Sequence, residues 1–182
     1  MDISKLSKGD KLVAGGAVAF LVSMFLPWFS FSAGPYEASA NGWDFGFWGV
    51  LMMIVLLAAA ALVVLPAAGK TVNAPAIIVL AITAVAALFT VLKLLIGQNG
   101  LDRSFGLFLA VLGAGAAAFG GFLKFQESGG SVADLKDPNK LKGQMKSGFS
   151  TLAADLKDGA KDLSKDAKGL ADDVKDKLDG DK

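Results

Sequence analysis

The chain has 182 residues, of which 53% are hydrophobic and 19% are charged, and its formal net charge is +1. It contains neither histidine nor cysteine. This composition excludes disulfides, thiolate metal sites, a cysteine nucleophile and the commonest general base of enzymes. The near-zero net charge gives no general attraction to nucleic acid. We therefore expect a non-enzymatic protein without catalytic, cofactor-binding or metal-binding residues and without a nucleic-acid partner.

The charged residues divide the chain into two unlike parts. Residues 1–125 carry seven basic and five acidic residues, whereas residues 126–182 carry eleven lysines and twelve acidic residues. The sequence ESGGS at residues 127–131 has the composition of a flexible linker. We therefore predict a membrane domain at residues 1–125, a linker at residues 126–136 and a charged cytoplasmic tail at residues 137–182.

The first part is predicted to be an all-α bundle of four transmembrane helices. Each of its four apolar windows reaches the roughly 20 residues that a helix needs to span a bilayer core. The predicted spans are at about residues 12–32, 46–66, 74–96 and 104–124. A cleaved signal peptide is the competing interpretation of the first window, but that window is longer than the roughly 7–15 apolar residues of such a peptide.

The distribution of lysine and arginine favours both termini in the cytoplasm. Three lysines precede the first span and the tail is rich in lysine, whereas the loop at about residues 31–44 has neither lysine nor arginine. Because positive charges concentrate in cytoplasmic segments, this loop is predicted to lie outside. Arg103 in the third loop does not fit this distribution of charges. An even number of spans, however, agrees with both termini lying on the same side of the membrane.

Two rows of small residues are predicted to bring helices close together, because small side chains allow backbones to approach. In the first span the row is Gly15, Ala19 and Ser23. In the fourth span the spacing alternates between four and three residues, which suits left-handed packing, and the row is Gly106, Ala110, Gly113, Ala117 and Gly120. The second row serves packing within one bundle or, alternatively, contact between two copies of the protein.

Aromatic residues and one lysine gather near the predicted outer interface. Trp28, Trp43 and Trp48 are interpreted as interfacial anchors, because tryptophan is enriched at that depth. The alternative is that they form a ligand or partner site. Lys93 is the only charge inside a predicted span, since Lys124 marks the end of the fourth span. Its closeness to the helix end favours snorkelling to the headgroups over a functional role inside the membrane.

The tail carries an eleven-residue repeat, which corresponds to about 3.67 residues per helical turn. On a helical wheel its apolar, lysine and aspartate positions form three separate faces. The apolar face comprises Leu141, Met145, Phe149, Leu152, Leu156, Leu163, Leu170, Val174 and Leu178. Several glycines weaken such a helix, so we predict an amphipathic helix that requires a surface. The alternative is a solvated, partly disordered tail.

Two resemblances rest on these patterns. The repeat at about residues 141–178 resembles the amphipathic repeats of late-embryogenesis-abundant proteins and of lipid-associated helices. The first 125 residues resemble a group of small, uncharacterised four-span membrane proteins of actinobacteria. That resemblance is carried by KGDK at residues 8–11, Gly15-Gly16, FLPWF at residues 25–29 and Trp43. It implies a plasma-membrane location and brings no activity or site.

Together these features predict an anchor or scaffold whose cytoplasmic tail binds protein partners, itself or the membrane surface. The expected partners are the lipid bilayer, an unidentified protein and a second copy joined through the fourth span or the tail. The alternative function is a small oligomeric channel or transporter subunit, with Asp44, Lys93, Asp102 and Arg103 near its outer mouth. The lack of ionisable residues in the other spans weakens that alternative.

Overall fold

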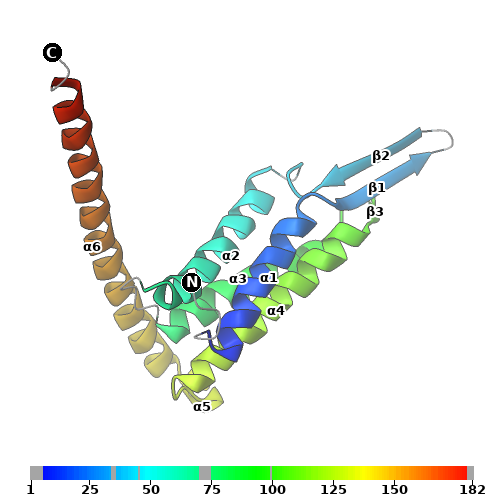
Figure 1. The fold of residues 1–182 in the computed structure, drawn as a ribbon. Coiled ribbons are helices and arrows are strands. Elements are labelled where there is room, and N and C mark those ends of the chain that lie inside the picture. Colours follow the sequence, from blue (N-terminus) through cyan, green and yellow to red (C-terminus); the bar gives the residue numbers. More distant parts are fainter. Residues whose placement is uncertain (1–5, 34–35, 45, 70–74, 99, 180–182) are drawn as a thin grey trace.

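A computed structural model describes residues 6–33, 36–44, 46–69, 75–98 and 100–179 (Figure 1). The chain is mostly helical, as predicted, but it also contains a small sheet of three strands. The helices are α1 (Lys8–Ser23), α2 (Gly46–Ala67), α3 (Ala76–Ile96), α4 (Phe105–Glu127), α5 (Val132–Lys136) and α6 (Pro138–Asp179). The strands are β1 (Pro27–Ala33), β2 (Tyr36–Asn41) and β3 (Asp102–Arg103).

Three helices, α2, α3 and α4, are long and apolar enough to cross a membrane. They have 22, 21 and 23 residues, and at about 1.5 Å per residue they match the roughly 30 Å hydrocarbon core of a bilayer. Helix α1 has 16 residues, which corresponds to only about 24 Å. The prediction of one continuous helix at about residues 12–32 is therefore wrong, because the first helix ends at Ser23.

Helix α1 ends at Ser23, four residues before Pro27, and side-chain hydrogen bonds stabilise its last turn. Proline lacks a backbone N–H and disfavours helical geometry in the residue before it. The indole Nε1 of Trp28 donates a hydrogen bond to the carbonyl oxygen of Ser23 at 2.8 Å, and the Ser23 hydroxyl donates to the carbonyl oxygen of Phe20 at 2.5 Å. The carbonyl oxygens of Phe20 and Ser23 also accept the backbone N–H groups of Met24 at 3.2 Å and Leu26 at 3.1 Å. The side-chain bonds therefore reinforce the last turn of α1, after which the chain continues into β1.

The strands form a sheet in the order β2-β1-β3, with antiparallel pairing throughout. In the hairpin of β1 and β2, Ser30 is paired with Ser39, and on the other side of β1 Ser30 is paired with Asp102. Figure 1 shows the hairpin projecting beyond one end of the helical bundle. The segment that was predicted as an outer loop thus contains ordered strands, and we refer to this end as the hairpin end.

The first four helices form an antiparallel bundle in which each helix packs against two others. Helix α1 packs against α2 and α4, and α3 packs against the same two helices. The core between them is apolar, and its largest fully buried side chains include Phe20, Met24, Leu56, Ile78 and Leu107. The start of α1 and the end of α4 consequently lie together at the end opposite the hairpin.

The closest helix contact is between α1 and α4, along the glycine-rich row of α4. Gly106, Ala110, Gly113, Ala117 and Gly120 are all buried. A Cβ atom on Gly113 would lie 2.8 Å from the Gly16 carbonyl oxygen, and one on Gly120 would lie 2.7 Å from the Gly9 carbonyl oxygen. Such distances leave no room for a side chain, so the two backbones touch here.

On α1 the contact residues differ from those expected. Gly15 faces open space, Ala19 is half-buried and only Ser23 of that row is buried. The close approach is made instead by Gly9 and Gly16, where an added Cβ atom would lie within 2.7 Å of α4 backbone atoms. The side of α1 that faces α4 therefore carries Gly9 and Gly16, and not Gly15 as predicted.

Beyond the bundle, the chain forms α5 and the 42-residue helix α6. Helix α5 lies inside the segment that was predicted as a flexible linker, and Ser131 caps its N-terminus. Figure 1 shows α6 starting beside the bundle end opposite the hairpin and then splaying away from the bundle.

Candidate functional site

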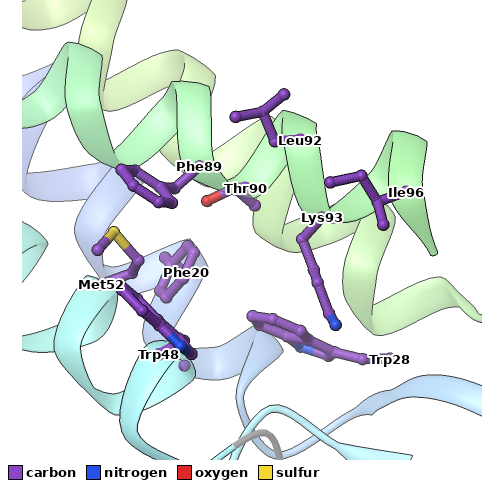
Figure 2. Close-up of a pocket in the computed structure, with 10 residues that line it drawn as sticks. Phe20, Trp28, Trp48, Met52, Phe89, Thr90, Leu92, Lys93 and Ile96 are labelled. Carbon is purple, nitrogen blue, oxygen red and sulfur yellow. The ribbon is translucent and has the colours of Figure 1, made fainter. Parts of the chain in front are cut away.

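A cavity of about 230 Å³ lies between the helices near the hairpin end (Figure 2). Phe20 of α1 and Trp28 of β1 line its buried side, and α2 contributes Trp48 and Met52. Helix α3 contributes Phe89 and Lys93, among others. Almost all of these side chains are apolar, so the cavity suits an apolar ligand better than a polar one.

Aromatic rings in two different arrangements shape the walls of the cavity. Trp48 stacks on Phe89 across α2 and α3, with ring centroids 5.9 Å apart and an interplanar angle of 13°. Trp28 meets Phe20 edge to face, at 5.9 Å and 84°. Both arrangements are favourable for aromatic pairs. The residues that form these walls come from distant parts of the sequence, and no spacing in the sequence indicates that they meet.

The three tryptophans predicted as interfacial anchors differ in exposure. Trp43 and Trp48 are 37% and 60% exposed, whereas Trp28 is only 3% exposed. The ring of Trp28 is thus buried in the bundle core instead of facing outward. The hydrogen bond from its indole to Ser23 satisfies its polar atom inside that core.

Lys93 stands at the rim of the cavity, near the end of α3. Its Nζ donates a hydrogen bond to Oε1 of Gln98 at 2.8 Å, and it lies 5.6 Å from the centroid of the Phe29 ring. Figure 2 shows its side chain running from α3 towards Trp28. Lys93 therefore places a positive charge beside an apolar cavity, in the last turn of α3.

The other charged residues expected near an outer mouth have structural roles. Arg103 donates hydrogen bonds from Nε to the Leu94 carbonyl oxygen at 2.5 Å and from Nη2 to the Leu95 carbonyl oxygen at 2.9 Å. It thereby satisfies the last carbonyl groups of α3. Asp44 accepts a hydrogen bond from the Asn41 backbone at 2.7 Å in the turn before α2, and Asp102 pairs with β1 in the sheet.

At the opposite end of the bundle, the first turns of α6 lie against α3 and α4. Leu141, Met145 and Leu152 pack against the cluster of Ile77, Ile78 and Phe125. Gly148 is buried in this contact, and a Cβ atom there would lie 2.8 Å from Cγ1 of Ile78. One side of α6 is therefore docked on the bundle over about three turns.

Of the remaining positions of the predicted apolar face, the structure describes the side chain of Phe149. Phe149 is 51% exposed. The side chains of Leu156, Leu163, Leu170, Val174 and Leu178 lie outside those that the structure describes, although α6 continues as a helix to Asp179. The apolar positions spaced by eleven residues share one side of a helix, so the docked positions and the later ones follow one line along α6.

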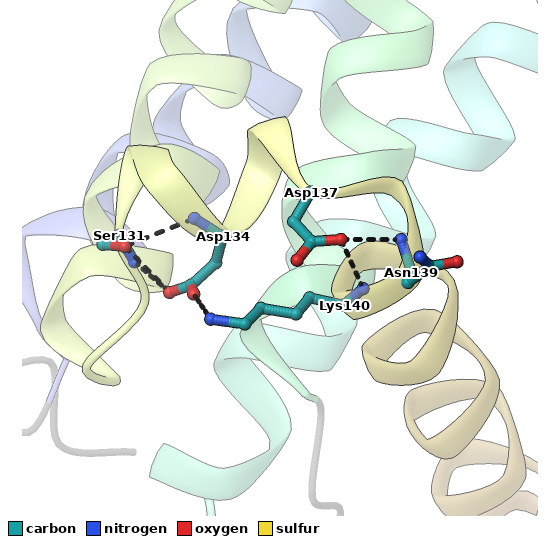
Figure 3. A network of polar contacts seen from close by, with 5 residues as sticks. All are labelled: Ser131, Asp134, Asp137, Asn139 and Lys140. Carbon is teal, nitrogen blue, oxygen red and sulfur yellow. Dashed lines mark hydrogen bonds and ion pairs between the residues drawn. The ribbon is translucent and has the colours of Figure 1, made fainter.

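A polar network fixes the junction of α5 and α6 (Figure 3). Ser131 and Asp134 form a capping box, and Asp134 also contacts Nζ of Lys140 at 3.4 Å. The hydrogen bond from the Ser131 hydroxyl, followed by its backbone N–H and Lys140, holds the pKa of Asp134 below its usual range. Asp137 accepts hydrogen bonds from the backbone N–H groups of Asn139 and Lys140 at 3.0 and 3.3 Å, which starts α6.

Within the described ranges, no group of three or more acidic side chains is placed to hold a metal ion. Among the polar features of the described residues are the lysine at the cavity rim and the charged surface of α6. No family model, curated protein or solved structure matches this chain.

Proposed function

We propose that this protein is a non-enzymatic anchor of the plasma membrane that holds α6 at the cytoplasmic face as an interaction element. The observation that supports this proposal most directly is the docking of Leu141, Met145 and Leu152 on the bundle. This contact fixes where α6 starts, while most of its 42 residues extend past the bundle.

The bundle has the properties that an anchor requires. Helices α2, α3 and α4 are long enough to span a bilayer, and α1 is joined to α4 along most of its length by close glycine contacts. Membrane helices associate through such close packing, because lipid provides no hydrophobic drive between them. We therefore propose that α1 is also embedded, as the short fourth member of the bundle, with both chain termini in the cytoplasm.

Helix α6 has the properties of a binding element. Its described surface is rich in exposed lysines and aspartates, among them the pair Lys161 and Asp158, whose charged atoms are 3.8 Å apart. Isolated exposed pairs contribute little to stability, so these charges serve solubility and recognition more than folding. The line of apolar positions supplies the area for contact with a protein partner, with a second copy or with the membrane surface.

Photo-crosslinking of the full-length protein in its membrane tests this proposal. A benzophenone amino acid replaces Leu163 on the apolar line of α6 or, as the matched control, Lys165 on the lysine face. Discrete adducts from position 163 that exceed those from position 165 are expected, and mass spectrometry then identifies a protein, a second copy or a lipid. Equal and diffuse labelling from both positions would contradict a binding role for the apolar line.

The channel alternative receives less support from the geometry. The interior between the helices is filled by apolar side chains such as Phe20, Leu56 and Ile78, and Arg103 is engaged by α3 carbonyl groups. A conducting path through one bundle would therefore require these side chains to move. Ion or solute flux into liposomes that contain a protein truncated before residue 131 would favour a channel.

A further inference from the structure

We propose that the cavity at the hairpin end binds one acyl chain of an anionic phospholipid, with the lipid phosphate beside the ammonium group of Lys93. This inference concerns a different end of the molecule from α6 and does not depend on the function proposed for that helix.

The walls of the cavity suit a hydrocarbon chain. Phe20, Met52, Trp28 and Phe89 present rings and a thioether to the space. Thr90 also lines the cavity, and its hydroxyl donates a hydrogen bond to the Ala86 carbonyl oxygen of its own helix at 2.7 Å. An apolar space of this kind does not hold water well and binds apolar molecules instead.

The size and the opening of the cavity indicate part of a lipid. Its volume of about 230 Å³ lies below the roughly 300–1,000 Å³ of pockets that enclose a whole small molecule. Its rim is formed by residues that face outward from α2 and α3, since Trp48 is 60% exposed and Ile96 is 79% exposed. In a membrane this side contacts lipid, so a chain enters sideways while the remainder of the lipid stays in the bilayer.

The position of Lys93 selects the headgroup. Lys93 is the one charged residue among the described residues that line the cavity. It lies near the C-terminal end of α3, which is long enough to span the bilayer. Trp43 and Trp48, at the same end of the bundle, are of the type that is enriched at the interface between lipid tails and headgroups. A positive charge at this depth attracts a phosphate, and the low polarity of the surroundings strengthens that attraction.

A neutral or zwitterionic lipid fills the same space, but its headgroup carries no net negative charge to attract the lysine. An exposed or half-exposed ion pair has a modest effect, so we expect anionic lipid to bind about two- to fivefold more tightly than zwitterionic lipid. The selection is therefore a preference among lipids and not an absolute requirement.

Trp28 provides a specific reporter for a chain inside the cavity. It lines the cavity but is only 3% exposed, so lipids that merely surround the bundle do not contact its ring. A full-length variant with Trp43→Phe and Trp48→Phe leaves Trp28 as the single fluorescent indole, because the chain has three tryptophans. The phenylalanine at position 48 retains an aromatic ring next to Phe89.

The variant is reconstituted into vesicles that contain phospholipid with brominated acyl chains, which quench tryptophan on close approach. Brominated phosphatidylglycerol and brominated phosphatidylcholine are titrated separately into a non-brominated phosphatidylcholine background. We expect half-maximal quenching of Trp28 at a two- to fivefold lower mole fraction of the anionic lipid. Lys93→Gln should remove this difference, whereas Lys93→Arg and Lys146→Gln, at the far end of the molecule, should retain it.

Two results would overturn the proposal. Absence of Trp28 quenching by either lipid would show that no chain enters the cavity, and an unchanged preference in Lys93→Gln would show that this lysine does not select the headgroup. Native mass spectrometry of the detergent-solubilised protein is the second measurement. It should show one bound phosphatidylglycerol on the Lys93→Arg protein and about two- to fivefold weaker binding of it to Lys93→Gln, with circular dichroism showing equal helix content in both variants.

Discussion

Lys124 and Asp10 form an ion pair that joins the start of α1 to the end of α4, the first and last helices of the four-helix bundle. Nζ of Lys124 lies 2.6 Å from Oδ1 of Asp10, and both side chains are largely buried. The same carboxylate accepts a hydrogen bond from the backbone of Ser7 at 3.3 Å, within the capping box that starts α1. One side chain thus fixes the start of α1 and its attachment to the end of α4.

Asp10→Asn should lower the stability of the bundle. The asparagine keeps an acceptor for the Ser7 backbone but leaves the Lys124 ammonium without its counter-charge, and such a loss at a mostly buried position costs about 1–3 kcal/mol. The thermal unfolding midpoint in detergent measures this change. Lys161→Gln, which disrupts an exposed pair, is the control and should have a smaller effect. Additive effects of Asp10→Asn and Lys124→Met in a double-mutant cycle would show that the two groups are not coupled.

Replacing glycine by alanine should lower the stability of the bundle where α1 and α4 touch, but not at glycines that face open space. A Cβ atom at position 16 or 113 would lie 2.5 or 2.8 Å from the facing carbonyl oxygen. Gly16→Ala and Gly113→Ala are therefore each expected to cost about 1–3 kcal/mol through overpacking. Gly15→Ala and Gly115→Ala meet no atom within 4 Å and should leave the unfolding midpoint unchanged or slightly raised. Equal effects in both pairs would refute the close approach of the two backbones.

The sequence predicted the helices well where composition alone determines them. The apolar windows of α2, α3 and α4 have the length of a membrane span, and their helices lie close to the predicted positions. The phase of α1 was harder, because its glycines and alanines occupy several sides and periodicity does not select one. Gly16 and Gly15 are adjacent in sequence, and only packing against Gly113 distinguishes them.

The hairpin was missed for a different reason. Trp28 and Phe29 are as apolar as the helix before them, so hydropathy does not mark the change at Pro27. A signal was present, since Phe29, Ser30, Phe31 and Ser32 alternate with the period of a strand. The cavity had no such signal, because Trp28, Trp48 and Phe89 meet only after three separate elements have packed together.

The orientation of the protein in the membrane can be tested with single cysteines, because the chain has none. Ser39 lies exposed on β2 and Ser164 lies exposed on α6. With both termini in the cytoplasm, a membrane-impermeant thiol reagent should label Ser39→Cys but not Ser164→Cys in intact cells. Permeabilised cells are the control, in which both variants should react. Labelling at position 164 alone in intact cells would reverse the orientation.

A disulfide can test whether α6 is docked on the bundle. A Cβ atom on Gly148 would lie 3.4 Å from Cβ of Pro75, which is close to the range of about 3.5–4.5 Å that a disulfide requires. The double variant Pro75→Cys with Gly148→Cys should therefore oxidise readily in the membrane, and the loss of reactive thiols measures the reaction. The bond closes a long loop, which favours a higher unfolding midpoint, but a Cβ atom at position 148 also lies 2.8 Å from Cγ1 of Ile78 and crowds it. The loss of thiols, and not the midpoint, is therefore the measurement that decides.

The matched control for this disulfide moves the second cysteine by one eleven-residue repeat. Gly159 follows Gly148 at that spacing and has no atom within 4 Å of an added Cβ. Pro75→Cys with Gly159→Cys should therefore keep its thiols under the same oxidation. Adding Met145→Asp to the first pair should slow its oxidation, because a charged side chain cannot remain against Ile77, Ile78 and Phe125 without a partner. If both cysteine pairs oxidise at the same rate, α6 samples many positions and its first turns are not held by the bundle.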